Sequence, residues 1–430
     1  MDRSSWIQRY VATRAETERL AAPLSDEDRM VQAMADASPT KWHLAHTTWF
    51  FENFLVLATG GEAFHPSYGY LFNSYYEAVG PRHARPARGL LSRPSTVEIA
   101  AYRTAVDARM VDLLERSDGE TRAGLAPLVR LGVAHEEQHQ ELILTDILAA
   151  FAANVLEPVY VAAPEIVDPT ADEVSGDGCE PARFVSFEGG LVTLGARDDL
   201  PFAFDNERPA HRVFLEPYAV AERPITLGEA AAFAREGGYR TPSLWLSEGW
   251  DWAQHTSATA PGYTRFDDGV ASVLTLHGRR VPSPRTPAAH LSYYEADAIA
   301  RWLGARLPTE AEWEHAACSA PLTGHFRDEG WLTPRPQQPS GSADATVPRL
   351  QGLFGDVWEW TSSAYGPYPG FAPARGAIGE YNGKFMVGQM VLRGGSCLSN
   401  RAHLRASYRN FWPPHTRFQM TGARLARDAR

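Results

Sequence analysis

Two kinds of sequence meet near Leu156, and this change constrains the fold more than any other feature of the chain. Before it, apolar residues recur at mostly helical spacings, whereas short strand-like segments rich in Gly, Pro and Trp follow it. A stretch rich in Pro, Asp and Gly separates the two: EPVYVAAPEIVDPTADEVSGDGCEP. We therefore expect a helical domain at residues 1–157, a linker at 158–180 and a mixed α+β domain at 181–430.

The helical half carries start signals for several helices. Ser25 begins a Ser-x-x-Asp stretch similar to a capping box, and Ser38-Pro39 opens a second helix that continues through TKWHLAHTTWFFENFLVLA. Helical patterns follow at about 94–115 and, for the longest helix, at about 125–153. Four helices with apolar stripes predict an up-down bundle, and the long loop at about 65–93 is a place where function is expected.

The second half predicts a less regular arrangement. FVSFEGGLVTLGA has the pattern of a β-hairpin around Gly189-Gly190. One helix is expected to begin near Thr226, and another to run from Ser292 to Leu303. Short strands and turns should make up the rest of this half.

Composition argues against several classes of protein. Of the 430 residues, 44% are apolar, which is enough for real cores and argues against a disordered chain. Acidic residues outnumber basic ones by 52 to 41, so a nucleic-acid partner is not expected. The N-terminus lacks the apolar core of a signal peptide and no run of 18 apolar residues occurs, so we expect a soluble, cytoplasmic protein without a membrane partner.

The three cysteines, Cys179, Cys318 and Cys397, lie far apart and form no CxxC pair. This pattern argues against a disulfide framework and against a structural zinc site with thiolate ligands.

Histidines give the strongest chemical signal. HEEQH places His135 and His139 at i and i+4 of a helix, on one face and roughly 6 Å apart, so both rings can reach one metal. Glu136 completes the literal HExxH pattern of zinc proteases. That class also expects a third ligand downstream, and nothing after His139 offers the usual motif. The alternative to a metal site is a histidine pair that faces solvent or lines the core.

A second cluster, WHLAH, supplies His43 and His46 on the second helix. Ligands in helical bundles commonly project inward from different helices, so one of these two can complete a set of three. Three histidines leave positions for substrate and dioxygen, an arrangement that suits non-haem Fe(II). Spacing alone does not choose between His43 and His46.

Three segments of the helical half, SPTKWHLAH, YLFNSYYEAVGPRH and HEEQHQEL, resemble the ergothioneine-biosynthesis sulfoxide synthases. The second half is similar to that family's formylglycine-generating-enzyme-type domain, in GARLPTEAEWEHAA, GDVWEWTSS, VLRGGSC, YRNF and TGARLARD. The resemblance runs from about Leu24 to Asp428. It implies a DinB-like four-helix bundle followed by an α+β domain of the C-type-lectin-like fold.

The resemblance also implies a chemistry. The family holds one Fe(II) on three histidines, which match His46, His135 and His139, and His43 would then have a structural or supporting place. Its reaction uses O2 to join sulfur to C2 of the imidazole of Nα-trimethylhistidine (hercynine) and makes a sulfoxide. The implied partners are therefore small molecules: hercynine, a thiol or selenium donor, and O2.

Further residues are matched to the betaine substrate. Gln138 matches a glutamine that hydrogen-bonds the substrate imidazole, and Asn410 matches a residue that binds the carboxylate. The trimethylammonium group needs aromatic or acidic neighbours, for which Phe411, Trp412 and Asp36 are candidates.

The loop between the second and third helices carries the other candidates. Tyr75 and Tyr76 match a tyrosine pair that can donate a proton or a hydrogen bond near the iron. Other branches of the family place this tyrosine in the second domain, where Tyr381 is the weaker candidate. Arg82 and Arg85 can hold the donor's carboxylate, whereas Arg88 and Arg93 are interpreted as surface charges.

Departures from the family pattern keep other functions in view. Branches that use γ-glutamylcysteine tend to have Trp-Asp after the asparagine, where this chain has Phe411-Trp412, and this favours free cysteine or another donor. Selenoneine synthase, which joins a selenosugar to hercynine, is therefore an alternative. A second alternative is a non-catalytic metal-binding DinB-like protein with a lectin-like binding module.

Two further classes are disfavoured. Formylglycine-generating enzymes use a cysteine pair, and Cys397 has no partner cysteine after it. Ovothiol-type synthases usually carry a methyltransferase domain, which we do not expect here because the sequence runs out at Arg430.

Overall fold

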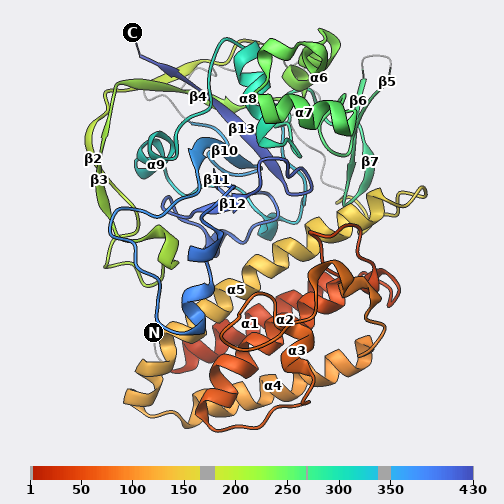
Figure 1. Ribbon diagram of the computed structural model, residues 1–430, viewed down its shortest axis with the longest axis vertical. Coiled ribbons are helices and arrows are strands. Elements are labelled where there is room, and N and C mark those ends of the chain that lie inside the picture. Colours follow the sequence, from red (N-terminus) through yellow and green to blue (C-terminus); the bar gives the residue numbers. More distant parts are fainter. Residues whose placement is uncertain (1–2, 165–179, 268–269, 338–349, 430) are drawn as a thin grey trace. The chain divides into compact units, whose positions relative to one another are not determined.

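The computed structural model describes residues 3–164, 180–267, 270–337 and 350–429. Its contacts divide the chain into two units (Figure 1). Unit 1 consists of residues 1–161 with 373–381, and unit 2 consists of 162–372 with 382–430. Most of the expected linker, residues 165–179 with Cys179, lies outside the described residues, and the expected domain boundaries stay predictions.

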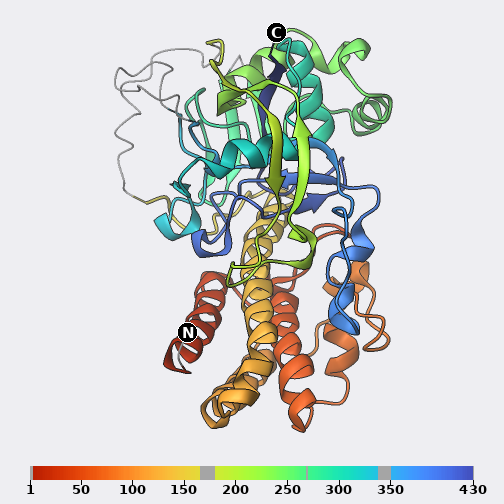
Figure 2. The ribbon, with the colours of Figure 1, turned by 90° about the vertical axis from the view of Figure 1, so that its left-hand side faces the viewer.

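Unit 1 is a bundle of four long helices, and Figure 2 shows helices of this unit running alongside one another. Helices α1 and α2 each pack against both α4 and α5. A short helix, α3 (Tyr68–Phe72), lies in the long loop after α2. The four long helices are α1 (Arg3–Ala21), α2 (Thr40–Phe51), α4 (Thr96–Arg116) and α5 (Gly119–Ala152).

Local signals start these helices where they begin. The Ser95 side chain accepts from the backbone N–H of Glu98, whose carboxylate accepts from the N–H of Ser95, so a full capping box opens α4. The Asp118 side chain caps α5 by accepting from the N–H of Thr121 at 2.8 Å. Helix α2 continues through a π-helical turn at Glu52–Val56, so the helical run extends about as far as predicted.

The first helix differs from the prediction. Ser25 and Asp28 do exchange capping-box hydrogen bonds, but only one 3₁₀ turn, Asp28–Met30, follows them. The first long helix is α1, which ends before Ser25. Its inward face carries Arg14, which is 3% exposed and paired with the buried carboxylate of Glu136, so the pattern of α1 does not look apolar in sequence.

A glycine allows α2 and α5 to approach closely. A Cβ atom at Gly132 would lie 2.5 Å from Cε1 of Phe51 and 3.2 Å from Cε1 of Phe50. Any larger side chain at this position would push the two helices apart. This contact therefore sets the spacing of the side chains that follow one turn later on α5.

Unit 2 is built on a six-stranded sheet with the order β1-β4-β13-β10-β11-β12. The β10–β13 pair is parallel, and the other neighbours are antiparallel. The strands are β1 (Phe184–Phe187), β4 (Tyr218–Pro224), β13 (Thr421–Asp428), β10 (Trp358–Ala364), β11 (Met390–Arg393) and β12 (Asn410–Trp412).

Smaller sheets complete the strand structure of unit 2. They are a ribbon, a three-stranded sheet and a short parallel pair. Their strands are β2 (Gly190–Leu194) with β3 (His211–Leu215), β5 (Thr264–Asp267) with β6 (Val270–Thr275) and β7 (Gly278–Arg280), and β8 (Gly324–His325) with β9 (Phe354–Gly355).

The predicted hairpin around Gly189-Gly190 is wrong. Strand β1 pairs with β4 and β2 pairs with β3, so the two segments belong to different sheets. The glycines do turn the chain, with φ angles of +69° and +94°. A Cβ at Gly189 would lie 2.3 Å from the carbonyl oxygen of Leu215, so the backbones approach too closely for a side chain.

Both helices predicted in unit 2 are present, as α6 (Leu227–Arg235) and α8 (Tyr293–Trp302), and each begins with a capping box. Two more, α7 (Ser247–Thr256) and α9 (Glu310–Cys318), were not predicted. Helix α9 also begins with a capping box, in which Thr309 and Glu312 exchange hydrogen bonds. The buried residues of α9 include three glutamates, Glu310, Glu312 and Glu314, so its inward face shows no apolar stripe in the sequence.

Buried ion pairs connect the sequence motifs of unit 2. Glu310 on α9 accepts from Arg393 at 2.9 Å and from Arg409 at 2.6 Å. Glu359 on β10 pairs with Arg424 on β13 at 2.9 Å, and both side chains are fully buried. The motifs LPTEAEWEHAA, VLRGGS, YRN and TGARLARD thus supply a framework of paired charges for the core.

The helices and the cysteines bear on the expectations about membranes and disulfides. Within the described residues, no helix combines the length and the apolar character needed to cross a membrane. Cys318 is exposed, Cys397 is buried, and both are free thiols.

Candidate metal centre

Three buried histidines converge in unit 1. His46 comes from α2, His135 and His139 come from α5, and one nitrogen of each lies within 4.8 Å of the others. We call this group the histidine trio. Nε2 of His46 lies 3.2 Å from Nε2 of His135. Two nitrogens that bind one metal at about 2.1 Å lie about 3 Å apart in adjacent positions, so the trio fits a metal ion.

His46 is held in one orientation. Its Nδ1–H donates to the backbone carbonyl of Phe72 at 2.6 Å. Its ring is stacked between Trp42 and Trp49, with centroid distances of 4.5 and 5.5 Å. A hydrogen bond at Nδ1 leaves Nε2 with the lone pair, which is the nitrogen that faces His135.

Burial keeps the trio neutral. It lowers the pKa of His46 and of His139 well below the usual value, and it lowers the pKa of His135 to about 3. Metal binding requires neutral imidazoles, so no proton has to leave these rings at neutral pH. Nδ1 of His135 is buried and, within the described residues, has no hydrogen-bond partner.

His43 contacts the trio and is outside it. Its Nδ1 lies 2.8 Å from Nδ1 of His139, and its Nε2 lies 3.0 Å from Oδ2 of Asp146. Spacing left His43 and His46 as equal candidates, and the geometry favours His46 for the third position.

Glu136 does not have the position that a zinc protease needs. Its carboxylate, which is fully buried, accepts from Arg14 at 2.8 Å and from Arg103 at 3.1 Å. Burial alone would raise the pKa of Glu136, but the charges of Arg14 and Arg103 outweigh it and lower that pKa. Because both oxygens are bound to arginines, this carboxylate is not available as a base toward a metal-bound water.

The loop at about residues 65–93, which we call the tyrosine loop, carries a buried phenol. Tyr76 is fully buried, and its hydroxyl lies 3.5 Å from that of Tyr75. The amide of Asn73 accepts from the N–H of Tyr76 and donates to the carbonyls of Tyr76 and Gly80, which fixes the turn. Burial raises the pKa of Tyr76 well above its usual value, so this phenol keeps its proton.

A segment that comes much later in the sequence packs beside the histidine trio. Residues 373–381 belong to unit 1, and Tyr381 donates from its hydroxyl to Oε1 of Gln138 at 2.5 Å. The Tyr381 ring lies 5.7 Å from that of His135 and 6.4 Å from that of Tyr75. Gln138, Tyr75 and Tyr381 are therefore close neighbours.

Glu380 is a residue that sequence reasoning missed. Its carboxylate accepts from the backbone N–H groups of Glu77 and Ala78, each at 2.9 Å. It thereby ties the tyrosine loop to residues 373–381. The acidic residue directly before Tyr381 was the signal, but its partners lie more than 300 positions earlier in the sequence.

The structure shows which arginines of the loop are exposed and which is buried, and one of them differs from the prediction. Arg82 and Arg85 are exposed, and Arg82 pairs with Glu77. Arg88, interpreted from sequence as a surface charge, is only 2% exposed and lies 3.4 Å over the ring of Trp42. The prediction for Arg88 is therefore wrong, because stacking on a buried tryptophan draws the side chain inward. Arg93 is exposed as expected.

Of the remaining candidates, Asp36 belongs to unit 1, and Asn410, Phe411 and Trp412 belong to unit 2. Asp36 is exposed in the turn before α2. Asn410, Phe411 and Trp412 form β12, one of the two edge strands of the large sheet of unit 2. The ring of Phe411 stacks on that of Tyr365 at 4.0 Å. The roles expected for these four residues stay predictions.

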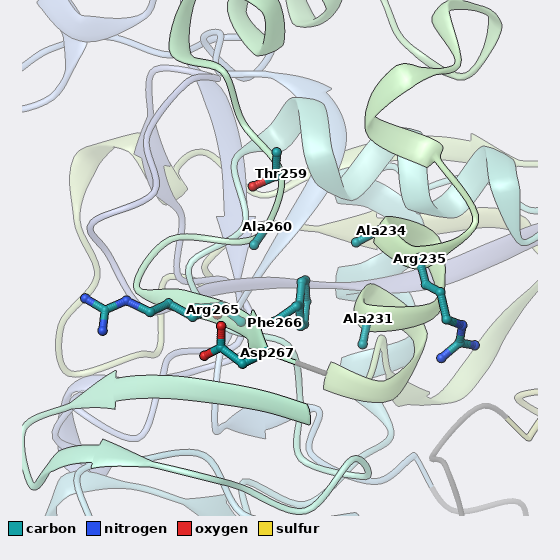
Figure 3. Close-up of a pocket in the computed structure, with 9 residues that line it drawn as sticks. Ala231, Ala234, Arg235, Thr259, Ala260, Arg265, Phe266 and Asp267 are labelled. Carbon is teal, nitrogen blue, oxygen red and sulfur yellow. The ribbon is translucent and has the colours of Figure 1, made fainter. Parts of the chain in front are cut away.

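Unit 2 also contains an open pocket of about 500 Å³, shown in Figure 3. Helix α6 and strand β5 supply most of its lining, and no candidate residue from the sequence lies in it. Its lining residues are Ala231, Ala234, Arg235, Thr259, Ala260, Thr264, Arg265, Phe266 and Asp267. They include no histidine or cysteine, and the pocket has no part in the metal centre.

Two protein families match the chain, one in each half. Residues 9–143 match the DinB superfamily. Residues 170–429 match the family described as sulfatase-modifying factor enzyme 1-like domain. Together with the helical bundle and the mixed sheets, these matches confirm the predicted α+β fold class with a DinB-like bundle first.

Similar proteins were found for the whole chain and for its second half. Hercynine oxygenase of Mycobacterium tuberculosis is 33% identical, with 96% of this chain and 96% of that protein covered. Hercynine oxygenase of Mycolicibacterium smegmatis is 32% identical, with 91% of each covered. Formylglycine-generating enzyme of Streptomyces coelicolor is 30% identical over 63% of this chain and 96% of its own length.

Among solved structures, PvdO from Pseudomonas aeruginosa is 22% identical, covers 59% of this chain and 97% of its own, and has a TM-score of 0.41. Three relatives that match through both halves are each named hercynine oxygenase. With a buried histidine trio in its bundle, this chain is an enzyme of the hercynine oxygenase family.

Proposed function

We propose that this enzyme is an Fe(II)- and O2-dependent sulfoxide synthase that joins the sulfur of a thiol to C2 of the imidazole of hercynine. The observation that carries the proposal is the histidine trio, three buried and neutral nitrogen donors in one bundle. His46, His135 and His139 are proposed as the iron ligands. The similarity to hercynine oxygenases over nearly the full length supports the choice of substrate.

The donor set supports iron over zinc. Three imidazoles without a thiolate or carboxylate leave positions for exogenous ligands, which is how non-haem Fe(II) sites bind substrate and dioxygen together. The HExxH alternative needs Glu136 as a base, and that carboxylate is bound to Arg14 and Arg103. Bound Fe(II) would supply oxygen activation and lower the pKa of a coordinated thiol.

For hercynine, we propose contacts on three of its groups. Tyr381 fixes the amide of Gln138, for which we propose a hydrogen bond to the substrate imidazole. Asn410 is proposed to bind the carboxylate. The trimethylammonium group is assigned to the aromatic rings of Phe411 and Trp412 and to Asp36, because such cations bind ring faces and carboxylates.

Tyr75 and Tyr76 are proposed to hold the proton that oxygen chemistry requires. The raised pKa of Tyr76, caused by burial, keeps its phenol protonated until a strong base is present. The ring of Tyr75 lies 4.6 Å from that of Tyr76 and 6.4 Å from that of Tyr381. We propose that the pair delivers a proton from one of its phenol oxygens.

The sulfur donor is proposed to be cysteine. Arg82 and Arg85 are exposed on the tyrosine loop and are proposed to bind its carboxylate. The absence of an acid at position 412, which is Trp412 here, is why γ-glutamylcysteine is the less favoured donor. Selenoneine synthesis, with a selenosugar in place of the thiol, is an outcome that the following experiment would reveal.

The test is a product assay by mass spectrometry. Protein loaded with Fe(II) without oxygen is given hercynine with cysteine, γ-glutamylcysteine or a selenosugar in parallel, and O2 is then admitted. We expect a hercynine–cysteine sulfoxide and oxygen uptake that needs both substrates. No substrate-dependent oxygen uptake with any donor would refute the enzyme proposed here, and His135→Ala protein is the matched blank.

A further inference from the structure

A chain of hydrogen bonds runs behind one member of the histidine trio. Oδ2 of Asp146 lies 3.0 Å from Nε2 of His43, and Nδ1 of His43 lies 2.8 Å from Nδ1 of His139. All three side chains are buried, with 6%, 2% and 8% exposed. Asp146 follows His139 by two turns of α5, and His43 precedes His46 by one turn of α2.

The chemistry of the three side chains fixes which atom donates and which accepts in each of these hydrogen bonds. A carboxylate only accepts hydrogen bonds, so Nε2 of His43 carries a proton. A neutral imidazole has one N–H, so Nδ1 of His43 accepts, and the donor opposite it is Nδ1–H of His139. His139 then has its lone pair on Nε2.

Metal binding by His139 requires the same placement of its proton. If Nδ1 of His139 is bonded to His43, then Nε2 is the nitrogen that His139 can offer to the trio. A metal on Nε2 needs the proton on Nδ1. The carboxylate of Asp146 at one end of this hydrogen-bonded series and the metal site at the other therefore specify one tautomer for each ring.

Asp146 is itself held in place. The oxygen that accepts from His43 also accepts from the backbone N–H of Ser38 at 2.7 Å. The hydroxyl of Ser38 accepts from Nη1 of Arg88 at 2.9 Å, so a buried guanidinium lies one hydrogen-bonded residue beyond the carboxylate. Burial lowers the pKa of Arg88, and its other hydrogen bond goes to the hydroxyl of Ser74 at 3.2 Å.

We infer that Asp146 and His43 are positioning residues that set the tautomer of His139 and thereby strengthen metal binding by the trio. The inference rests on the metal site of the proposed function. It gives the three ligands different support: a backbone carbonyl for His46, this two-residue relay for His139, and no hydrogen bond within the described residues for Nδ1 of His135.

Paired substitutions at His43 separate a relay from simple packing. In His43→Gln the amide can still accept from His139 and donate to Asp146, whereas His43→Leu fills similar space with neither ability. The relay predicts that the leucine variant loses about 10- to 100-fold in Co(II) affinity, as is usual when a ligand's hydrogen-bond partner is removed. The glutamine variant should stay close to wild type.

A second pair tests the carboxylate. Asp146→Asn keeps an oxygen that both His43 and Ser38 can donate to, and Asp146→Leu removes it. The relay predicts a smaller loss for asparagine. Glu137→Gln is the matched control, because Glu137 is a buried carboxylate on the same helix that pairs with Arg9. It should leave Co(II) affinity unchanged.

The measurement is a Co(II) titration of full-length metal-free protein against a chelator, with circular dichroism melting curves to show that each variant folds. Equal losses for His43→Gln and His43→Leu, or a similar loss in Glu137→Gln, would overturn the relay. If the wild-type protein bound no metal, the proposed function would fail instead.

A second readout does not need the metal. In ¹⁵N-histidine-labelled metal-free protein, the ring nitrogen shifts report where each proton lies, and single variants assign the signals. We expect His43 protonated on Nε2 and His139 on Nδ1. A proton on Nε2 of His139, or protons on both nitrogens of His43, would refute the inference.

Discussion

The two sides of helix α5 bury polar groups in opposite ways. On one side Glu136 is enclosed by Arg14 and Arg103, and we call these three residues the ion-pair cluster. On the other side the histidine trio brings neutral rings together, with two nitrogens 3.2 Å apart and no counter-charge among its members.

Within the five residues HEEQH, one side chain is therefore expected to stabilise the fold, and two are expected to serve the chemistry. Paired charges satisfy one another and need nothing further, so the ion-pair cluster is expected to hold α1, α4 and α5 together. Lone pairs that face each other are unfavourable until a cation lies between them. We therefore interpret HEEQH as a structural motif at Glu136 and propose a ligand role for His135 and His139.

The largest effect should come from the trio itself. We expect His135→Ala, His139→Ala and His46→Ala to abolish iron binding and turnover with little change in melting temperature. Metal analysis and oxygen uptake would check this, with the exposed His65→Ala as control. Full iron content in His46→Ala would move the third ligand to His43.

The ion-pair cluster should respond in the reverse way. Glu136→Gln removes the carboxylate that Arg14 and Arg103 share and leaves each with one outer partner, Asp107 and Glu18 respectively. We expect this to lower the free energy of unfolding by up to about 3–5 kcal/mol, the cost of breaking a buried ion pair. Urea unfolding measures this. The folded variant should still bind one metal per chain, and a loss of metal at unchanged stability would contradict the division between the two sides.

How far the sequence predicts this arrangement depends on the range of the forces involved. The i, i+4 spacing of His135 and His139 is local, because helix geometry alone places both rings on one face. The choice of His46 over His43 depends on how α2 packs, and the spacing left both residues open. The family resemblance resolved it in the direction that the geometry favours.

Features that depend on distant partners were missed or wrong. Arg14 makes α1 look polar because its partner Glu136 lies 122 positions away. Arg88 is a surface charge in any local pattern, and its burial depends on the ring of Trp42 and on hydrogen bonds to Ser38 and Ser74. Strand β2 follows a turn signal at Gly189-Gly190, yet it pairs with β3.

A smaller effect is expected at the tyrosine pair, which lies on the trio's side of the comparison. Tyr76→Phe removes the buried phenol proton and should lower sulfoxide formation by about 10²-fold, the scale of a positioned proton donor, and divert flux to thiol oxidation. Mass spectrometry of both products tests it. Unchanged product ratios in both Tyr75→Phe and Tyr76→Phe would refute a role for the pair.

The smallest effect should appear where α2 meets α5. Gly132→Ala places a methyl group against Phe51 and should cost about 1–3 kcal/mol of stability, as overpacking does. Because the same contact sets the approach of His46 to His135, metal affinity should fall as well. This variant would affect both measurements, whereas the histidine and Glu136 variants each affect one. Gly124→Ala, with nothing within 4 Å of an added Cβ, is the control.

Residues 373–381 have a consequence for how modular this enzyme is. They belong to unit 1 although residues of unit 2 precede and follow them in sequence, so the chain passes between the units three times, at 161–162, 372–373 and 381–382. A fragment cut after α5 would contain the trio but lack both Tyr381 and the Glu380 carboxylate that ties the tyrosine loop. During synthesis the bundle is complete only after most of unit 2 has left the ribosome. Recombination that exchanged the two halves as separate cassettes would split the site.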